Sequence, residues 1–144
     1  MNPEFPVSSL MSRDVIFVQP GTPITEIHQI FEANRFHHLP VVSHGRIVGM
    51  ISRPDYAKVR YMLVVTWSGS VELNASYDQL TAEDIMSTQV LHIEPGDTIG
   101  LAADIFLANT IHALPVIEDN ELVGIITSHD LLKHAYDAVT MMQS

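Results

Sequence analysis

The chain contains an internal repeat, and this repeat constrains its fold more than any other feature of the sequence. Shifting the 144-residue sequence by 75 positions aligns residues 9–58 with residues 84–133 without a gap, and 19 of these 50 positions are identical. A repeat of this length and regularity indicates that one structural unit is present twice. We therefore expect two small, similar units.

The residue pattern of each copy predicts three strands. The β-branched runs Val15–Val18 and Val90–Ile93 each stop at a Pro-Gly pair, so each is expected to form a short strand. Two further apolar runs flank the turn residues 43–46, and residues 118–121 supply the same turn in the second copy. This pattern predicts one hairpin per copy. Between the copies, Ser70–Leu73 is a candidate additional strand.

Each copy also predicts two helices. Thr22 followed by a proline predicts an N-cap with Pro at the first helical position, and Asp97 is the equivalent cap in the second copy. Apolar residues then recur at helical spacing as far as Asn34 and Asn109. A Ser/Thr-x-x-Asp segment after each hairpin resembles a capping box and predicts the second helix, which the first half of Val59–Thr81 extends. The expected unit is β-α-β-β-α, an α/β (α+β) fold.

A chain of 144 residues has room for one ordinary domain or two very small ones. The repeat places the first unit at residues 8–59, a linker or insertion at 60–81 and the second unit at 82–140. With 47% hydrophobic residues, the chain can supply its core without a metal or a disulfide. We expect a soluble globular protein.

Charge and cysteine content exclude several functions. The chain has 17 acidic and 7 basic residues, a net charge of -10, so it lacks the basic field that would hold nucleic acid or an anionic membrane surface. Cysteine is absent, which excludes disulfides, thiolate nucleophiles and thiolate metal sites. The N-terminus has no secretory signal pattern, and the longest apolar run, Tyr61–Trp67, is far shorter than the roughly 20 residues that cross a bilayer. We expect a cytoplasmic protein.

Three motifs occur once in each copy, in the same order and at the same spacing. They are an aliphatic-Pro-Val strand at 39–41 and 114–116, a Val-Gly-x-Ile strand at 48–51 and 123–126, and Ser/Thr-x-x-Asp at 52–55 and 127–130. Together they resemble the tandem cystathionine-β-synthase (CBS) domain pair, often called a Bateman module. The resemblance covers residues 8–136, nearly the whole chain.

The resemblance implies two βαββα repeats related by a pseudo-twofold axis, with small mixed sheets and helices packed on them. It also implies a homodimer and a regulatory role, in which adenosine-containing ligands such as AMP, ADP, ATP or S-adenosylmethionine bind in clefts between the repeats. Members of this family usually control an attached enzyme, channel or transporter, and standalone modules also occur, so an unknown regulated partner protein is expected here. No cofactor and no metal are implied.

The Ser/Thr-x-x-Asp segments suit a nucleotide for physical reasons as well. An ionised carboxylate only accepts hydrogen bonds, so Asp55 and Asp130 could each accept hydrogen bonds from both hydroxyls of a ribose diol. A helix start attracts phosphate through its unpaired amides. The candidate phosphate ligands are Ser52, Arg53, Thr127, Ser128, His129, His37, His38 and His112. In the competing interpretation each aspartate only caps its helix.

The remaining site predictions concern adenine and the difference between the two sites. By resemblance, the walls of an adenine slot are Met11, Ile16, Met86 and Leu91, which would serve equally well as core residues. Arg53 is a stronger phosphate partner than a histidine, so the first site is expected to bind the more anionic ligand. Pro54 removes a backbone donor there and could weaken that site.

Two other functions compete with ligand sensing. A structural dimerisation or interaction module without a nucleotide would use the apolar Tyr61–Trp67 run and Met141-Met142. A metal-dependent enzyme or sensor would use some of the 8 histidines, but no His-x-x-x-His pair lies beside an acid. No Gly-x-Ser-x-Gly turn is present either, so we expect that the protein is not an enzyme.

Overall fold

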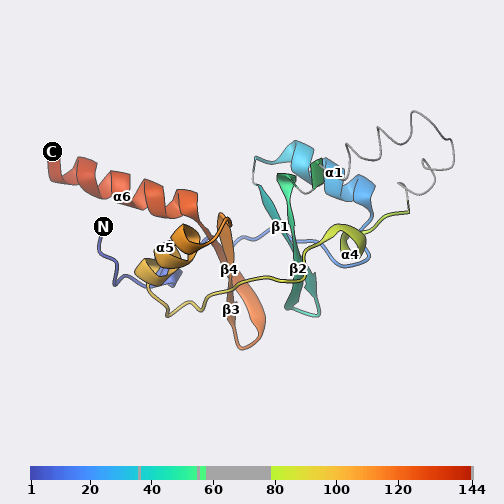
Figure 1. Ribbon diagram of the computed structural model, residues 1–144, viewed down its shortest axis with the longest axis horizontal. Helices are drawn as coiled ribbons and strands as arrows, with labels where there is room; N and C mark the ends of the chain where they lie inside the picture. Colours follow the sequence, from blue (N-terminus) through green and yellow to red (C-terminus); the bar gives the residue numbers. More distant parts are fainter. Residues whose placement is uncertain (36, 55, 58–78, 144) are drawn as a thin grey trace. The chain divides into compact units, whose positions relative to one another are not determined.

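The computed structural model describes residues 1–35, 37–54, 56–57 and 79–143, which form two compact units (Figure 1). Unit 1 consists of Met1–Val15 and Leu91–Ser144, and unit 2 of Ile16–Val90. Two small antiparallel hairpins combined with helices confirm the predicted α+β fold class. The candidate strand Ser70–Leu73, the Tyr61–Trp67 run and the predicted helix extension beyond Val59 lie outside the described residues.

Unit 2 is built around one hairpin. Its elements are α1 (Ile24–Ala33), β1 (His38–Ser43), β2 (Arg46–Ser52) and α4 (Ala82–Ile85). Strands β1 and β2 pair with His38 opposite Ser52. Val18 forms a parallel bridge to β1, and Ser87 forms an antiparallel bridge to β2, so both edges of the hairpin carry a further chain segment.

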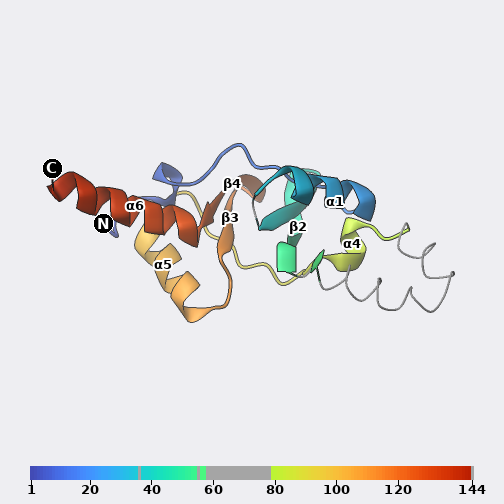
Figure 2. The same ribbon diagram turned by 90° about the horizontal axis from the view of Figure 1, so that it is seen from above.

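Unit 1 repeats this arrangement. Its elements are the short helix η1 (Val7–Ser9), α5 (Ile99–Ala108), β3 (Ala113–Glu118), β4 (Glu121–Thr127) and α6 (Ser128–Gln143). Ile93 bridges to β3 in parallel, and Ser12 bridges to β4 in antiparallel orientation. Figure 2 shows α5 beside α6, with the β3–β4 hairpin at the N-terminal end of α6.

The predicted hairpins are confirmed. Each turn has two residues with positive φ: His44 (53°) and Gly45 (80°) in unit 2, and Asp119 (52°) and Asn120 (66°) in unit 1. Two consecutive residues in the left-handed region match the right-handed twist of the flanking strands, and Gly, Asn and Asp reach this region at the lowest cost.

The predicted first strand of each repeat is wrong, because the structure has a single bridging residue in place of a strand. Within Val15–Val18 and Val90–Ile93, only Val18 and Ile93 make a bridge, and neither run forms a strand in the described chain. The physical reason is that each run leaves one unit and enters the other, at Val15/Ile16 and at Val90/Leu91. Only its last residue therefore lies beside a partner strand.

The predicted caps of the first helices are each wrong by one residue. Pro23, not Thr22, is the N-cap of α1, and the Thr22 hydroxyl accepts a hydrogen bond from the Gln19 amide in the preceding turn (3.0 Å). Thr98, not Asp97, caps α5 by accepting from Leu101 N–H at 3.1 Å. The predicted ends are confirmed, since Asn34 and Asn109 are the C-caps.

Each unit borrows a segment that precedes the other repeat. In unit 1, the carbonyl of Phe5 accepts from Ile99 N–H (2.8 Å), while in unit 2 the carbonyl of Leu80 accepts from Ile24 N–H (2.9 Å). Val7 and Ala82 are correspondingly buried, each in the core of its unit. The borrowed segments therefore cap the first helix of each unit and contribute to its core.

Candidate functional site

The predicted capping box at the start of α6 is present. The amide of Thr127 donates to Asp130 Oδ2 at 2.9 Å, and the amide of Asp130 donates to Thr127 Oγ1 at 3.1 Å. The reciprocal bonds fix the carboxylate at the helix start. Asp130 Oδ1 has no hydrogen-bond partner among the described residues, so it can accept a hydrogen bond from a ligand.

The histidines that precede β1 and β3 lie beside the segments that follow β2 and β4. The amide of Ser128 donates to the carbonyl of His112 (2.9 Å), and the amide of Arg53 donates to the carbonyl of His37 (2.7 Å). In unit 1, this bond gathers five predicted site residues at one end of the hairpin. We call them the second-repeat cluster: His112, Thr127, Ser128, His129 and Asp130.

The corresponding residues of unit 2 form the first-repeat cluster: His37, His38, Ser52 and Arg53. The predicted ribose ligand Asp55 lies outside the described residues. His37 is exposed, and His38, Ser52 and Arg53 are half-buried. In both repeats, the predicted phosphate ligands are thus brought together and remain accessible.

The two helix starts differ in the amides they offer. In the second repeat, Ser128 N–H donates to His112 and Asp130 N–H to Thr127, which leaves the amide of His129 without an acceptor in the described part of the chain. The equivalent position in the first repeat is Pro54, which has no N–H. At the two helix starts that follow the hairpins, the described residues therefore offer a ligand one unpaired amide, that of His129 in the second repeat.

The side chain of Arg53 binds the C-terminal end of α1. Its Nη2 donates to the carbonyls of Phe31 (2.7 Å) and Asn34 (2.9 Å), and its guanidinium carbon lies 5.1 Å from the centre of the Phe31 ring. The cation stabilises the negative end of the helix dipole. An anionic ligand that binds Nη2 would have to compete with these carbonyls.

A cluster of aromatic and polar side chains extends this contact and was not predicted. Phe31 stacks on Tyr56 with 5.3 Å between ring centres, and the Tyr56 hydroxyl is hydrogen-bonded to Nδ1 of His28. The second repeat has Ala103 and Leu131 in place of His28 and Tyr56. A comparison of the two copies for polar residues without a counterpart could have found this cluster.

The predicted adenine residues divide into two kinds. Met11 is 8% exposed and lies in the core of unit 1, and Met86 is half-buried against the core of unit 2. Ile16 and Leu91 are 46% and 50% exposed, so their side chains are open to a ligand. The structure thus gives Met11 and Met86 a packing role and leaves Ile16 and Leu91 accessible.

The described residues contain no group of three or more His, Asp or Glu side chains arranged to hold a metal ion. None of the helices in the described ranges is long and apolar enough to cross a membrane.

Comparison with known proteins identifies the family. The model of the CBS domain matches residues 7–61 and 82–137. Protein MJ1225 of Methanocaldococcus jannaschii is 34% identical over 132 residues, which cover 89% of this chain and 46% of that protein. Its crystal structure superposes with a TM-score of 0.80 and 32% identity, covering 93% of this chain and 49% of that one.

Two further relatives have similar lengths to this chain. The CBS domain-containing protein YhcV of Bacillus subtilis is 27% identical over 125 residues, 87% of this chain and 81% of YhcV. The CBS domain pair of protein MJ0100, solved in complex with 5′-methylthioadenosine and S-adenosyl-L-methionine, has a TM-score of 0.75 and 26% identity, covering 94% of this chain and 99% of that one.

The curated relatives that match first are longer proteins, of which this chain spans between 14% and 46%. The repeat, the α+β units and the double match to the family model agree with one another. The chain belongs to the CBS domain family, with two copies of the domain in tandem.

Proposed function

We propose that this protein is a regulatory module that binds an adenosine-containing ligand, of the class of AMP, ADP, ATP or S-adenosylmethionine, and controls a partner protein. The observation that carries the proposal is the second-repeat cluster, in which Asp130 is fixed with one oxygen unpaired, next in the chain to the unpaired amide of His129, and in which the backbone of His112 binds Ser128. Family membership and the adenosyl ligands of the MJ0100 domain pair support the ligand class.

Each part of the ligand has a proposed set of contacts in the second repeat. Asp130 Oδ1 accepts from the ribose hydroxyls. The substituent on the ribose 5′ carbon lies at the helix start, near the His129 amide and the hydroxyls of Thr127 and Ser128, with His112 beside them. Adenine packs on apolar side chains, for which Leu91 is exposed enough.

The first repeat is proposed to bind a second ligand through Asp55, Ser52, Arg53, His37 and His38. Arg53 would contribute its permanent positive charge, while its Nη2 binds the carbonyls at the end of α1. The earlier expectation that this site prefers the more anionic ligand stays a prediction, supported by the permanent charge of Arg53.

The role is proposed to be regulatory rather than catalytic. The sequence has neither a nucleophile turn nor a cysteine, and the residues gathered in the two clusters are those expected to bind a nucleotide. A cytoplasmic location belongs to the same proposal, because a chain without cysteine forms no disulfide that would require an oxidising compartment.

Substitutions of Asp130 test the proposal. An asparagine can still accept the hydrogen bond from Thr127 N–H, so Asp130→Asn should keep the helix cap while it weakens AMP and S-adenosylmethionine binding about tenfold or more, since a charged acceptor is lost. Isothermal titration calorimetry on the full chain measures the affinities. Asp137→Asn, on the exposed part of the same helix, is the matched control and should bind like the wild type.

Asp130→Ala separates the two roles of the carboxylate. It removes both the charge and the cap, so it should also lower the free energy of unfolding by about 1 kcal/mol. If Asp130→Asn binds like the wild type and only Asp130→Ala loses stability, the carboxylate is a cap and the proposed site is wrong.

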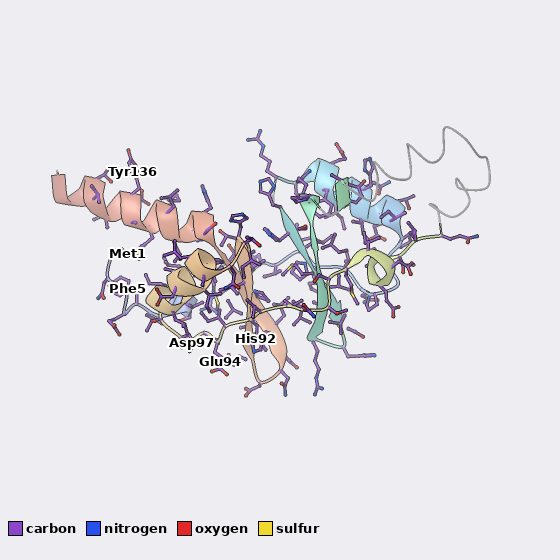
Figure 3. The ribbon with its side chains drawn as sticks, in the orientation of Figure 1. Met1, Phe5, His92, Glu94, Asp97 and Tyr136 are labelled. Carbon is purple, nitrogen blue, oxygen red and sulfur yellow. The ribbon has the colours of Figure 1, made fainter. Side chains whose placement is uncertain are left out.

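A dimerisation or interaction module without a nucleotide is the second candidate, and one observation favours it. Leu132, Tyr136 and Val139 form a stripe on α6 at i, i+4 and i+7, and they are 70%, 67% and 50% exposed. In Figure 3, Tyr136 projects on the side of α6 opposite Met1 and Phe5. We propose that this stripe forms part of a homodimer contact, which can coexist with ligand binding. A dimer that binds no adenosyl compound at millimolar concentration would favour the second candidate alone.

A further inference from the structure

The two units differ strongly in charge. Unit 1 contains ten carboxylate side chains and two basic ones, a net charge of -8 with histidines neutral. Unit 2 contains seven carboxylate and five basic side chains, a net charge of -2. Most of the net charge of the protein therefore belongs to the unit that carries the second-repeat cluster.

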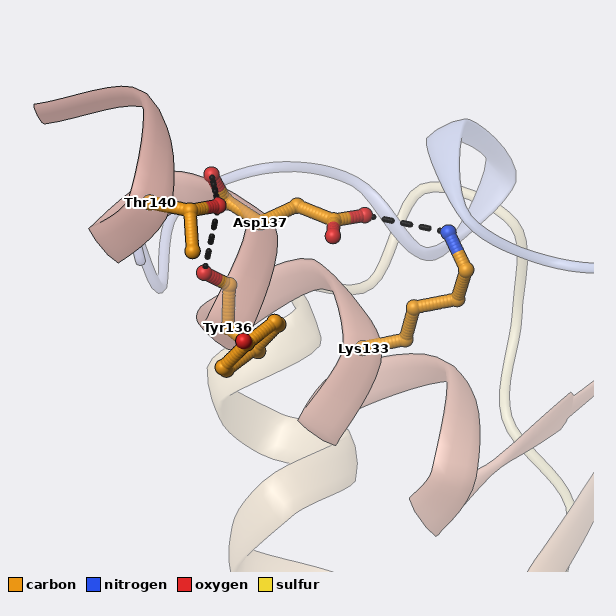
Figure 4. Close-up of polar contacts among 4 residues, drawn as sticks. All are labelled: Lys133, Tyr136, Asp137 and Thr140. Atoms are coloured by element: carbon orange, nitrogen blue, oxygen red, sulfur yellow. Dashed lines mark hydrogen bonds and ion pairs between the residues drawn. The ribbon is translucent and has the colours of Figure 1, made fainter. Parts of the chain in front are cut away.

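The two basic residues of unit 1 are engaged elsewhere. Lys133 forms an ion pair with Asp137 at 3.0 Å, one turn further along α6 (Figure 4). Arg13 lies on the N-terminal segment, where its Nη2 contacts the carbonyl of Ser8 at 3.5 Å. At the position equivalent to Arg53, the second repeat has Ser128. The second-repeat cluster therefore contains no permanent cation.

The charge of a ligand therefore affects binding to the second-repeat cluster. A triphosphate would bring several negative charges next to Asp130 and into the field of a unit with a net charge of -8. A neutral thioether avoids the repulsion, and a sulfonium cation is attracted.

We propose that the second-repeat cluster selects adenosyl ligands whose 5′ substituent is neutral or cationic, a thioether or a sulfonium, over those that carry a polyphosphate. This inference rests on the proposed function and specifies the ligand class of its best described site. The first-repeat cluster, which contains Arg53, does not share this selectivity.

The test is calorimetric titration of the full chain with 5′-methylthioadenosine, S-adenosylmethionine and ATP. The component that Asp130→Asn removes reports on the second repeat. We expect the two sulfur compounds to bind this component at least about tenfold more tightly than ATP at low salt. Raising the salt concentration from about 50 to 300 mM should weaken the binding of S-adenosylmethionine, strengthen the binding of ATP and leave the binding of 5′-methylthioadenosine unchanged.

The outcomes distinguish the inference from the function on which it rests. ATP binding most tightly to this component, and weakening with salt, would overturn the charge selectivity and leave the proposed function intact. Failure of all three compounds to bind would overturn the proposed function itself.

A pair of substitutions at Ser128 provides a second measurement. Ser128→Arg adds the cation that the first repeat has at this position, while Ser128→Gln adds a polar side chain without charge. Ser128→Arg should raise ATP affinity relative to 5′-methylthioadenosine by about tenfold, and Ser128→Gln should leave this ratio unchanged. Equal effects of the two substitutions on the ratio, or none from either, would contradict a selection by charge. Thermal unfolding shows whether each variant is folded.

Discussion

At the scale of single residues, the side chain of Arg53 has two candidate roles: it can contact a ligand, or it can cap the C-terminal end of α1. Arg53→Met keeps the apolar stem over Phe31 but removes both hydrogen bonds to the end of α1. We expect the free energy of unfolding to fall by about 1.5–3 kcal/mol, because these bonds have a charged donor. Chemical denaturation measures the difference.

Arg46→Met is the matched control, since Arg46 is exposed at the beginning of β2. It should change stability by less than about 0.5 kcal/mol. If Arg53→Met were as stable as this control but lost affinity for AMP, Arg53 would act on the ligand and not on the helix.

Two glycines lie under methionine side chains, and substituting them should have unequal costs. A Cβ at Gly124 would lie 2.9 Å from the carbonyl oxygen of Ser12 and 2.7 Å from Met11 Sδ, whereas the three atoms nearest to a Cβ at Gly49 all belong to the side chain of Met86. Both alanine substitutions should lower the free energy of unfolding by about 1–3 kcal/mol. The loss should be larger for Gly124→Ala because the backbone at Ser12 must move.

Double variants separate these two causes. Met86→Ala should recover part of the stability lost in Gly49→Ala, whereas Met11→Ala should recover little in Gly124→Ala, since the Ser12 carbonyl remains. Equal recovery at both positions, measured by denaturation, would show that side-chain crowding alone sets the cost.

Residue patterns predicted the site only in part. The register of Asp130 followed from Thr127, because a capping box fixes the spacing of its two members. The target of Arg53 did not follow from its position, since a long side chain reaches either a phosphate or the carbonyls of α1. Local sequence specifies backbone geometry at a helix start better than it specifies the direction of a flexible side chain.

At the scale of elements, the start of α5 depends on the Thr98 side chain. Thr98→Ala removes the acceptor for Leu101 N–H and should lower stability by about 1 kcal/mol. Thr98→Ser keeps an oxygen at the same place and should lose little. Thermal unfolding of the two variants decides the point, and equal stability of both would show that the cap contributes nothing.

Helix ends and hairpins were predicted well, and the first strands were not. Asn34 and Asn109 end α1 and α5 as expected, and each asparagine side chain donates to the carbonyl four residues earlier. The runs at 15–18 and 90–93 have strand-like composition, but pairing requires a neighbouring strand. That neighbour is present only for Val18 and Ile93.

At the scale of the whole molecule, the folding units are not the linear repeats of the sequence. The repeat identifies the two copies, but it cannot show that each unit takes its helix-capping segment from the part of the chain that precedes the other copy. The same segments also pair with the hairpins, through bonds between residues far apart in the chain. The amide of Met50 donates to the Ser87 carbonyl (2.9 Å), and the amide of Ser12 donates to the Ile125 carbonyl (2.8 Å).

Two fragments of equal length test this exchange. Residues 16–90 contain all of unit 2, including α4 and Ser87, whereas residues 1–75 contain the first repeat without them. We expect the 16–90 fragment to unfold cooperatively, with marginal stability for its size. The 1–75 fragment should be less stable or unfolded, because it lacks the buried Ala82 and the carbonyl that accepts from Ile24 N–H. Circular dichroism during thermal unfolding compares them, and equal or greater stability of the 1–75 fragment would show that the borrowed segment is dispensable to the fold of unit 2.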